Sequence, residues 1–102
     1  LLMTLRTQLG GPYIARSKDN GTTWSEATFS GLEGGESGTC LRRLPESDRV
    51  VLFWNNSKFN SEHHHFGERT PLSAAVSNDN GKTWRKLGDI CDNLKAEYTN
   101  LD

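Results

Sequence analysis

The sequence predicts an all-β fold built from a repeated unit of four short antiparallel strands. The octapeptide SKDNGTTW at residues 17–24 returns almost unchanged as SNDNGKTW at residues 77–84, with its aspartates, Asp19 and Asp79, 60 positions apart. Between the two copies, short apolar runs alternate with turn-forming residues, which is typical of β-strands and hairpins. No segment shows the 3.6-residue apolar period of an amphipathic helix.

Seven strands are expected from these runs, because each run is flanked by residues that favour turns. Their predicted ranges are 1–6, 13–16, 23–29, 39–44, 50–54, 72–76 and 83–87. The PESD stretch at 45–48 is a predicted turn. The polar stretch at 55–68 is a predicted long loop, and loops of that length within compact β-folds are usually functional or disordered.

Each octapeptide predicts a hairpin between the third and fourth strands of its unit. The Asp-Asn-Gly core is a strong hairpin signal, because Asn and Gly tolerate the positive φ angles of tight turns. The carboxylates of Asp19 and Asp79 can accept hydrogen bonds from backbone N–H groups, and the tryptophan that ends each octapeptide can pack across the loop. The octapeptides are therefore predicted to be structural.

Alignment on the octapeptides matches Ala15 with Ala75 and LLMTL with VVLFW, which gives a unit of four strands. Such a unit, repeated at this spacing, is typical of a β-propeller blade, which needs neighbours to bury its faces. We expect the last three strands of one blade at 1–34, a complete blade at 35–90 and the start of another at 91–102. The chain is thus expected to be a fragment that is marginally stable alone, with open sheet edges.

Composition argues against several classes of partner. The net charge of −1 and the pI near 6.3 give no reason to expect binding to nucleic acid or to an anionic membrane. The apolar runs are too short for a signal peptide or a membrane-spanning helix. Cys40 and Cys91 occupy different places in the repeat, which favours two buried thiols over a disulfide, and no metal-binding spacing or cofactor motif is present.

A second repeated word is Arg-Thr, at Arg6 and again at Arg69, and in both units it precedes the octapeptide. A guanidinium can form two parallel hydrogen bonds with a carboxylate, so two such groups from adjacent units could bind an acid group. The alternative is an ion pair between units or a solvated charge, while Thr7 and Thr70 can hydrogen-bond the turn. Arg42 and Arg43 have no counterpart and are predicted to lie on the strand surface.

Both octapeptides match S-x-D-x-G-x-T-W and resemble the Asp-box, or bacterial neuraminidase repeat; we call residues 17–24 the first box and 77–84 the second box. The resemblance implies a six-bladed β-propeller of sialidase type, of which this chain would cover about a third, or about two four-stranded antiparallel blades. In that family the boxes lie away from the active-site face. The matching residues are Ser17, Asp19, Gly21, Thr23, Trp24, Ser77, Asp79, Gly81, Thr83 and Trp84.

The resemblance also implies an activity, that of a retaining exo-α-sialidase. Arg6 and Arg69 resemble the second and third arginines that bind the substrate carboxylate, and Tyr98, 29 residues after Arg69, resembles the nucleophilic tyrosine. A neutral phenol suits this role, because a carboxylate nucleophile would be repelled by the acid group of the sugar. Many family members follow the tyrosine with Ser, whereas this chain has Thr99. The alternative for Tyr98 is a half-buried aromatic residue at the start of a strand.

The HHH stretch at 63–65 lies in the long loop between two glutamates. Adjacent histidines rarely converge on one metal ion, so a solvated loop at the rim of a substrate pocket is favoured over a metal site. Trp54 and Phe59 could supply stacking surface for a sugar, although Trp54 could equally belong to the core.

Two functions remain from these residues. One is a sialidase-type hydrolase acting on sialylated or other acidic glycans, whose acid/base aspartate, activating glutamate and first arginine would lie upstream of Leu1. The other is a non-catalytic propeller that binds carbohydrate or serves as a scaffold. The fragment alone is expected to be inactive and to require the remaining blades. The resemblance favours a secreted or periplasmic protein, and the residues themselves fix no compartment.

Overall fold

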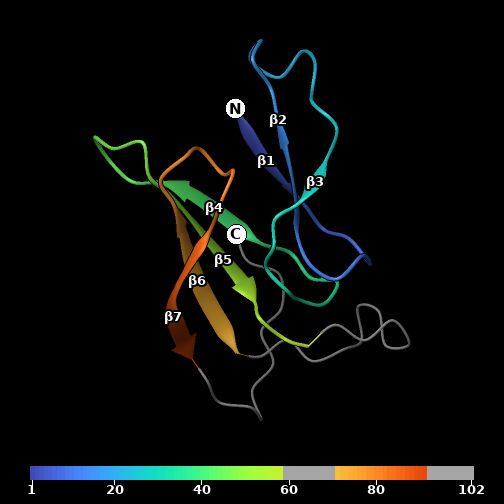
Figure 1. Ribbon diagram of the computed structural model, residues 1–102, viewed down its shortest axis with the longest axis vertical. Helices are drawn as coiled ribbons and strands as arrows, with labels where there is room; N and C mark the ends of the chain where they lie inside the picture. Colours follow the sequence, from blue (N-terminus) through green and yellow to red (C-terminus); the bar gives the residue numbers. More distant parts are fainter. Residues whose placement is uncertain (59–70, 92–102) are drawn as a thin grey trace.

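The computed structural model describes residues 1–58 and 71–91, in which seven strands form two antiparallel sheets (Figure 1). The first sheet has the order β1 (Leu2–Leu5), β2 (Tyr13–Arg16) and β3 (Thr28–Phe29). The second has the order β4 (Cys40–Arg43), β5 (Val50–Asn55), β6 (Leu72–Ser77) and β7 (Arg85–Cys91). These residues contain no helix, so the all-β prediction is confirmed, and none of them forms a helix able to cross a membrane.

The predicted strands are found near their expected positions, with two differences. β3 begins at Thr28 rather than at residue 23. Thr23 donates its backbone N–H to Asp19 within the first box, and the Ser25 hydroxyl accepts a hydrogen bond from Arg16 N at 2.9 Å, where a regular ladder would use a carbonyl. β7 begins two residues later than predicted and continues to Cys91. The turn at 45–48 is confirmed: Leu44 N donates to Arg49 O at 2.9 Å, and Glu46 has a φ of 55°.

The main apolar cluster combines the second sheet with the connection between β3 and β4. Leu52, Trp54 and Ala75 of the second sheet pack with Leu32 of that connection, and Trp84 packs against the cluster from the second box. Trp54 is only 2 % exposed, and its indole N–H donates to the backbone carbonyl of Glu33 at 2.9 Å. Trp54 therefore belongs to the core and is not a stacking surface for a sugar.

The opposite face of the second sheet carries its own cluster, formed by Val51, Ala74 and Val76. The two clusters alternate along β5 and β6, as expected when successive side chains of a strand point to opposite faces. Both faces of this sheet are therefore apolar. That pattern is typical of a sheet that packs between two neighbours.

Hydrogen bonds connect the two sheets at both ends of the first sheet. The Thr39 hydroxyl, just before β4, donates to the Thr4 hydroxyl of β1 at 2.8 Å. At the other end of the first sheet, Arg16 Nη2 donates to the backbone carbonyl of Asn80 in the second box at 3.3 Å. The first bond holds the end of β1 beside the start of β4, and the second holds the end of β2 beside the second box.

Candidate functional site

The first box is an Asp-centred hairpin, as predicted. Asn20 and Gly21 have φ angles of 58° and 92°, the left-handed region that a tight hairpin turn requires. Asp19 Oδ1 accepts from the backbone N of Thr23 and from the Ser17 hydroxyl, both at 2.8 Å, and Oδ2 accepts from the Thr23 hydroxyl at 2.5 Å. Ser17 Oγ in turn accepts from Gly21 N at 2.7 Å, which closes the loop around the aspartate.

The second box repeats these bonds and adds one, from Lys82 N to Asp79 Oδ1 at 3.1 Å. Asp79 Oδ1 accepts from Thr83 N at 2.8 Å and from the Ser77 hydroxyl at 2.7 Å, and Oδ2 accepts from the Thr83 hydroxyl at 2.5 Å. The tryptophans differ. Trp24 packs across its own loop and donates to Gly21 O at 3.1 Å. Trp84 instead packs against the core cluster, and its indole nitrogen has no hydrogen-bond partner among residues 1–58 and 71–91.

These hydrogen bonds stabilise the charged form of both aspartates. Donation from Thr23, first by its hydroxyl and then by its backbone N–H, lowers the pKa of Asp19 from 3.8 to about 2. The matching donation from Thr83 lowers the pKa of Asp79 further in the same direction. Each carboxylate is saturated with donors from its own hairpin, which fits a structural role.

Replacing Asp19 by asparagine should lower the melting temperature by several degrees, because the hairpin loses a charged acceptor. The pKa of Asp19 is lower in the folded state than its ordinary 3.8, so its stabilisation is present above about pH 4 and is lost as the pH falls toward about 2. Thermal melts between pH 2 and pH 7 measure this. The variant should lose part of the pH dependence, whereas Asp48→Asn, in the 45–48 turn, should keep it. An unchanged pH profile in the Asp19 variant would contradict the structural assignment.

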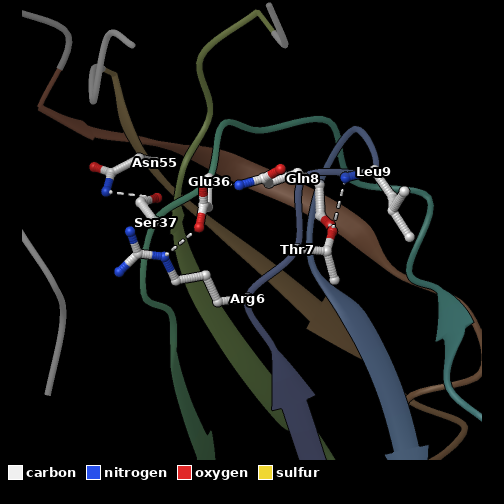
Figure 2. A network of polar contacts seen from close by, with 8 residues as sticks. Arg6, Thr7, Gln8, Leu9, Glu36, Ser37 and Asn55 are labelled. Atoms are coloured by element: carbon white, nitrogen blue, oxygen red, sulfur yellow. Dashed lines mark hydrogen bonds and ion pairs between the residues drawn. The ribbon is translucent and has the colours of Figure 1, made fainter. Parts of the chain in front are cut away.

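Arg6 lies at the other end of the first sheet from the first box, directly after β1. It opens the loop 6–12, which we call the Arg6 loop. The Thr7 hydroxyl donates to Gly11 O at 2.6 Å and accepts from Leu9 N at 3.2 Å, so Thr7 hydrogen-bonds the turn as expected (Figure 2). Arg6 is thus held on an ordered loop, with its side chain 37 % exposed.

The segment 30–39, which connects β3 with β4, runs beside the Arg6 loop. Gly34 N donates to Gly10 O at 3.0 Å, which joins the two backbones. A Cβ on Gly11 would lie 2.0 Å from Leu32 O, and a Cβ on Gly34 would lie 2.8 Å from Asn55 O. The glycines are therefore required by the close approach of the Arg6 loop, the connecting segment and the end of β5.

This approach brings Glu36 against Arg6. Glu36 Oε1 lies 3.6 Å from Arg6 Nε, and Glu36 Oε2 accepts from Gln8 Nε2 at 2.9 Å. Figure 2 shows the carboxylate between these two side chains of the Arg6 loop. The contact is an ion pair between the two sheets of the kind considered as the alternative for Arg6, yet it leaves the Arg6 side chain more than one third exposed.

Buried polar side chains lie beside this pair. Asn55, 1 % exposed at the end of β5, donates through Nδ2 to the hydroxyl of Ser37 at 3.1 Å. Ser57, 4 % exposed, accepts from Gly35 N at 3.2 Å. The Arg6 loop, the segment 30–39 and the end of β5 thus meet in one polar cluster. We call it the Arg6 cluster, and its members are Arg6, Gln8, Glu36, Ser37, Asn55 and Ser57.

Several predicted site residues lie outside residues 1–58 and 71–91: Phe59, His63, His64, His65, Arg69, Thr70 and Tyr98. Their predicted roles stay predictions. Arg42 and Arg43 are exposed on β4, as expected. Cys40 is not in a disulfide, but it is half-buried rather than buried, because it lies at the edge strand of the second sheet.

Sequence reasoning did not find the partners of Arg6. Gln8 follows it by two residues and Glu36 by thirty, so neither is marked by a short motif. The four glycines among residues 31–38 could have indicated a close approach of backbones, because glycine is favoured where no Cβ fits. No group of three or more potential metal-ligating side chains lies together within the part of the chain that the structure describes.

The fold and the two boxes define an all-β protein of Asp-box repeats. A family model described as "BNR repeat-like domain" matches residues 1–99 of the 102, and the chain belongs to this family. Comparison with curated proteins found no significant match, and comparison with solved structures found none either.

Proposed function

We propose that this chain is a segment of a β-propeller sialidase, a retaining exo-acting glycoside hydrolase that removes a terminal sialic acid or a related acid sugar. The observation that carries the proposal is the Arg6 cluster, in which a partly exposed arginine side chain lies where two sheets of Asp-box repeats meet. Family membership supports the same class of enzyme. The proposal implies a longer chain, which we call the complete protein.

The propeller part of the proposal is supported by corresponding positions in the two sheets. Leu52 is fully buried in the second sheet, but its counterpart Met3 is 37 % exposed in the first. Trp84 packs against the core, whereas its counterpart Trp24 is 38 % exposed. A further unit beside the first sheet would cover these side chains, just as Leu32 and the first sheet cover the second. Stacked units of this kind form a ring in propellers.

The substrate class follows from the chemistry of Arg6. A guanidinium binds a carboxylate through two parallel, charge-assisted hydrogen bonds, so the acid group of the sugar is the part that Arg6 would recognise. Arg69 is proposed to supply a second such group. It follows the loop that starts at the end of β5, and that end already contacts the Arg6 cluster through Asn55 and Ser37. We therefore propose that both arginines bind the same substrate carboxylate.

Tyr98 is proposed as the nucleophile. Its phenolic oxygen would attack the anomeric carbon beside the substrate carboxylate and form a covalent glycosyl intermediate, which water then hydrolyses. Two displacements at the same carbon retain the configuration. The base that takes the phenolic proton, and the acid that protonates the leaving group, would come from the upstream part of the complete protein.

The test is hydrolysis of an aryl α-sialoside by the complete protein, followed by NMR to identify the first anomer released. We expect release of the acid sugar as its α-anomer, and no release from the matching aryl β-galactoside, which lacks the carboxylate. A protein that binds the acid sugar but releases nothing would contradict the hydrolase and support the non-catalytic carbohydrate-binding module. A first product with inverted configuration would exclude the tyrosine nucleophile.

A further inference from the structure

We propose that Glu36 is a positioning residue that orients Arg6 for a substrate carboxylate, with Gln8 holding Glu36 in place. This inference rests on the proposed function, because it assigns a role to Arg6 in binding an acid sugar. It adds two residues of this chain to the site, and neither was marked by the sequence motifs.

The geometry of the pair carries the inference. Glu36 faces the guanidinium at Nε, with Oε1 at 3.6 Å. In Figure 2 the two terminal nitrogens of Arg6 lie on the side away from Glu36. A guanidinium offers two edges to a carboxylate, one formed by Nε with a terminal nitrogen and one formed by the two terminal nitrogens. Glu36 therefore occupies the Nε side and leaves the terminal edge for a second carboxylate.

The position of Glu36 is fixed from three directions. Gln8 Nε2 donates to Glu36 Oε2 at 2.9 Å, so the two carboxylate oxygens face different partners. The backbone on one side is held by the bond from Gly34 N to Gly10 O at 3.0 Å. On the other side the adjacent Ser37 accepts from the buried Asn55 at 3.1 Å. Glu36 is only 18 % exposed at its side chain, about half the value for Arg6.

Stability alone does not account for this pair. Ion pairs at partly exposed sites contribute little to folding, because solvent screens them and two side chains must be ordered. An ordered arginine, however, has a lower entropic cost when it binds a ligand. The opposing effect is the negative charge of Glu36, which would weaken attraction for an anionic substrate. The two effects predict opposite results when the charge is removed, so one variant can decide between them.

The test is a double-mutant cycle in the complete protein with an aryl α-sialoside as substrate. Glu36→Gln should raise KM about tenfold and change kcat by less than about threefold, because Arg6 binds the acid group and takes no part in bond making or breaking. In an Arg6→Lys background the same change should alter KM by less than about twofold, since Glu36 acts through Arg6. Gln8→Ala should raise KM in the same direction but by less.

The matched control is Glu26→Gln, which removes the same charge from an exposed position in the β2–β3 hairpin and should leave KM unchanged. Melting temperatures should agree within about two degrees among the folded variants. If Glu36→Gln does not fold, Glu36→Asp keeps the charge but shortens the reach, and it should also raise KM.

The outcomes separate the two claims. An unchanged or lower KM for Glu36→Gln, with Arg6→Lys still raising KM, would overturn the positioning role alone. An equal effect of Glu36→Gln in both backgrounds would also overturn it, because Glu36 would then act independently of Arg6. If the wild-type protein does not discriminate between acidic and neutral glycosides, the proposed function is overturned, and this inference with it.

Discussion

Replacing Tyr98 by phenylalanine in the complete protein is expected to lower kcat for an aryl α-sialoside by several orders of magnitude. The change removes the phenolic oxygen proposed to attack the anomeric carbon, but it keeps the aromatic ring. Steady-state kinetics measure the loss, and circular dichroism should show an unchanged fold. The prediction rests on the match of Tyr98 to the tyrosine of the sialidase pattern.

The matched control for this variant is Tyr13→Phe. Tyr13 lies in β2 and its ring packs against Phe29, with ring centroids 5.6 Å apart. Removing that hydroxyl should leave kcat unchanged, because the ring contact remains. Wild-type turnover in the Tyr98 variant would exclude the covalent route through this tyrosine and would leave Tyr98 as a structural aromatic residue.

Replacing Arg6 by lysine should lower kcat/KM for the acid sugar by about 10- to 150-fold, or roughly 1.5 to 3 kcal/mol of transition-state binding. Lysine keeps the positive charge but has no planar fork, so it cannot form two parallel hydrogen bonds with the carboxylate. The same change at Arg69 should have an effect of similar size. Steady-state kinetics with an aryl α-sialoside measure the loss.

Arg42→Lys is the control for this second prediction. Arg42 is exposed on β4 and donates through Nη1 to the carbonyl of Leu41 at 2.9 Å, so it takes no part in the Arg6 cluster. Its replacement should leave kcat/KM for the aryl α-sialoside unchanged. If Arg6→Lys leaves kcat/KM within twofold of the wild-type value, Arg6 does not bind the carboxylate, and its ion pair with Glu36 is then only a contact between sheets.

The hairpins could be predicted from the sequence because their chemistry is local. The Asp-Asn-Gly core sets the positive φ angles, and the Ser, Asp and Thr that hold the loop all lie within seven residues of one another. The strand pattern was predictable for the same reason. The shortened β3 was not, because its first predicted residues bond side chains instead of a neighbouring strand: Thr23 N donates to Asp19, and the Ser25 hydroxyl accepts from Arg16 N.

The surroundings of Arg6 could not be predicted, because they depend on how two sheets pack. The repeated Arg-Thr word singled out Arg6, and its position at the end of β1 agrees with the predicted strand boundary. Glu36, however, lies on the segment that connects the two sheets, and the contact between Gly34 and Gly10 holds this segment against the Arg6 loop. The burial of Asn55 likewise depends on that packing. Trp54 could belong to either environment by its residue type alone, and only the packing places it in the core.

The most direct measurement is the affinity of the complete protein for an unsaturated glycal of sialic acid, compared with the methyl ester of the same glycal by isothermal titration calorimetry. The two ligands differ only in the charge and hydrogen-bonding capacity of the acid group. The account predicts that the free acid binds about 100-fold more tightly, a difference of about 2.7 kcal/mol, and that Arg6→Lys removes most of that difference. Equal affinity for the acid and the ester would contradict carboxylate recognition at Arg6.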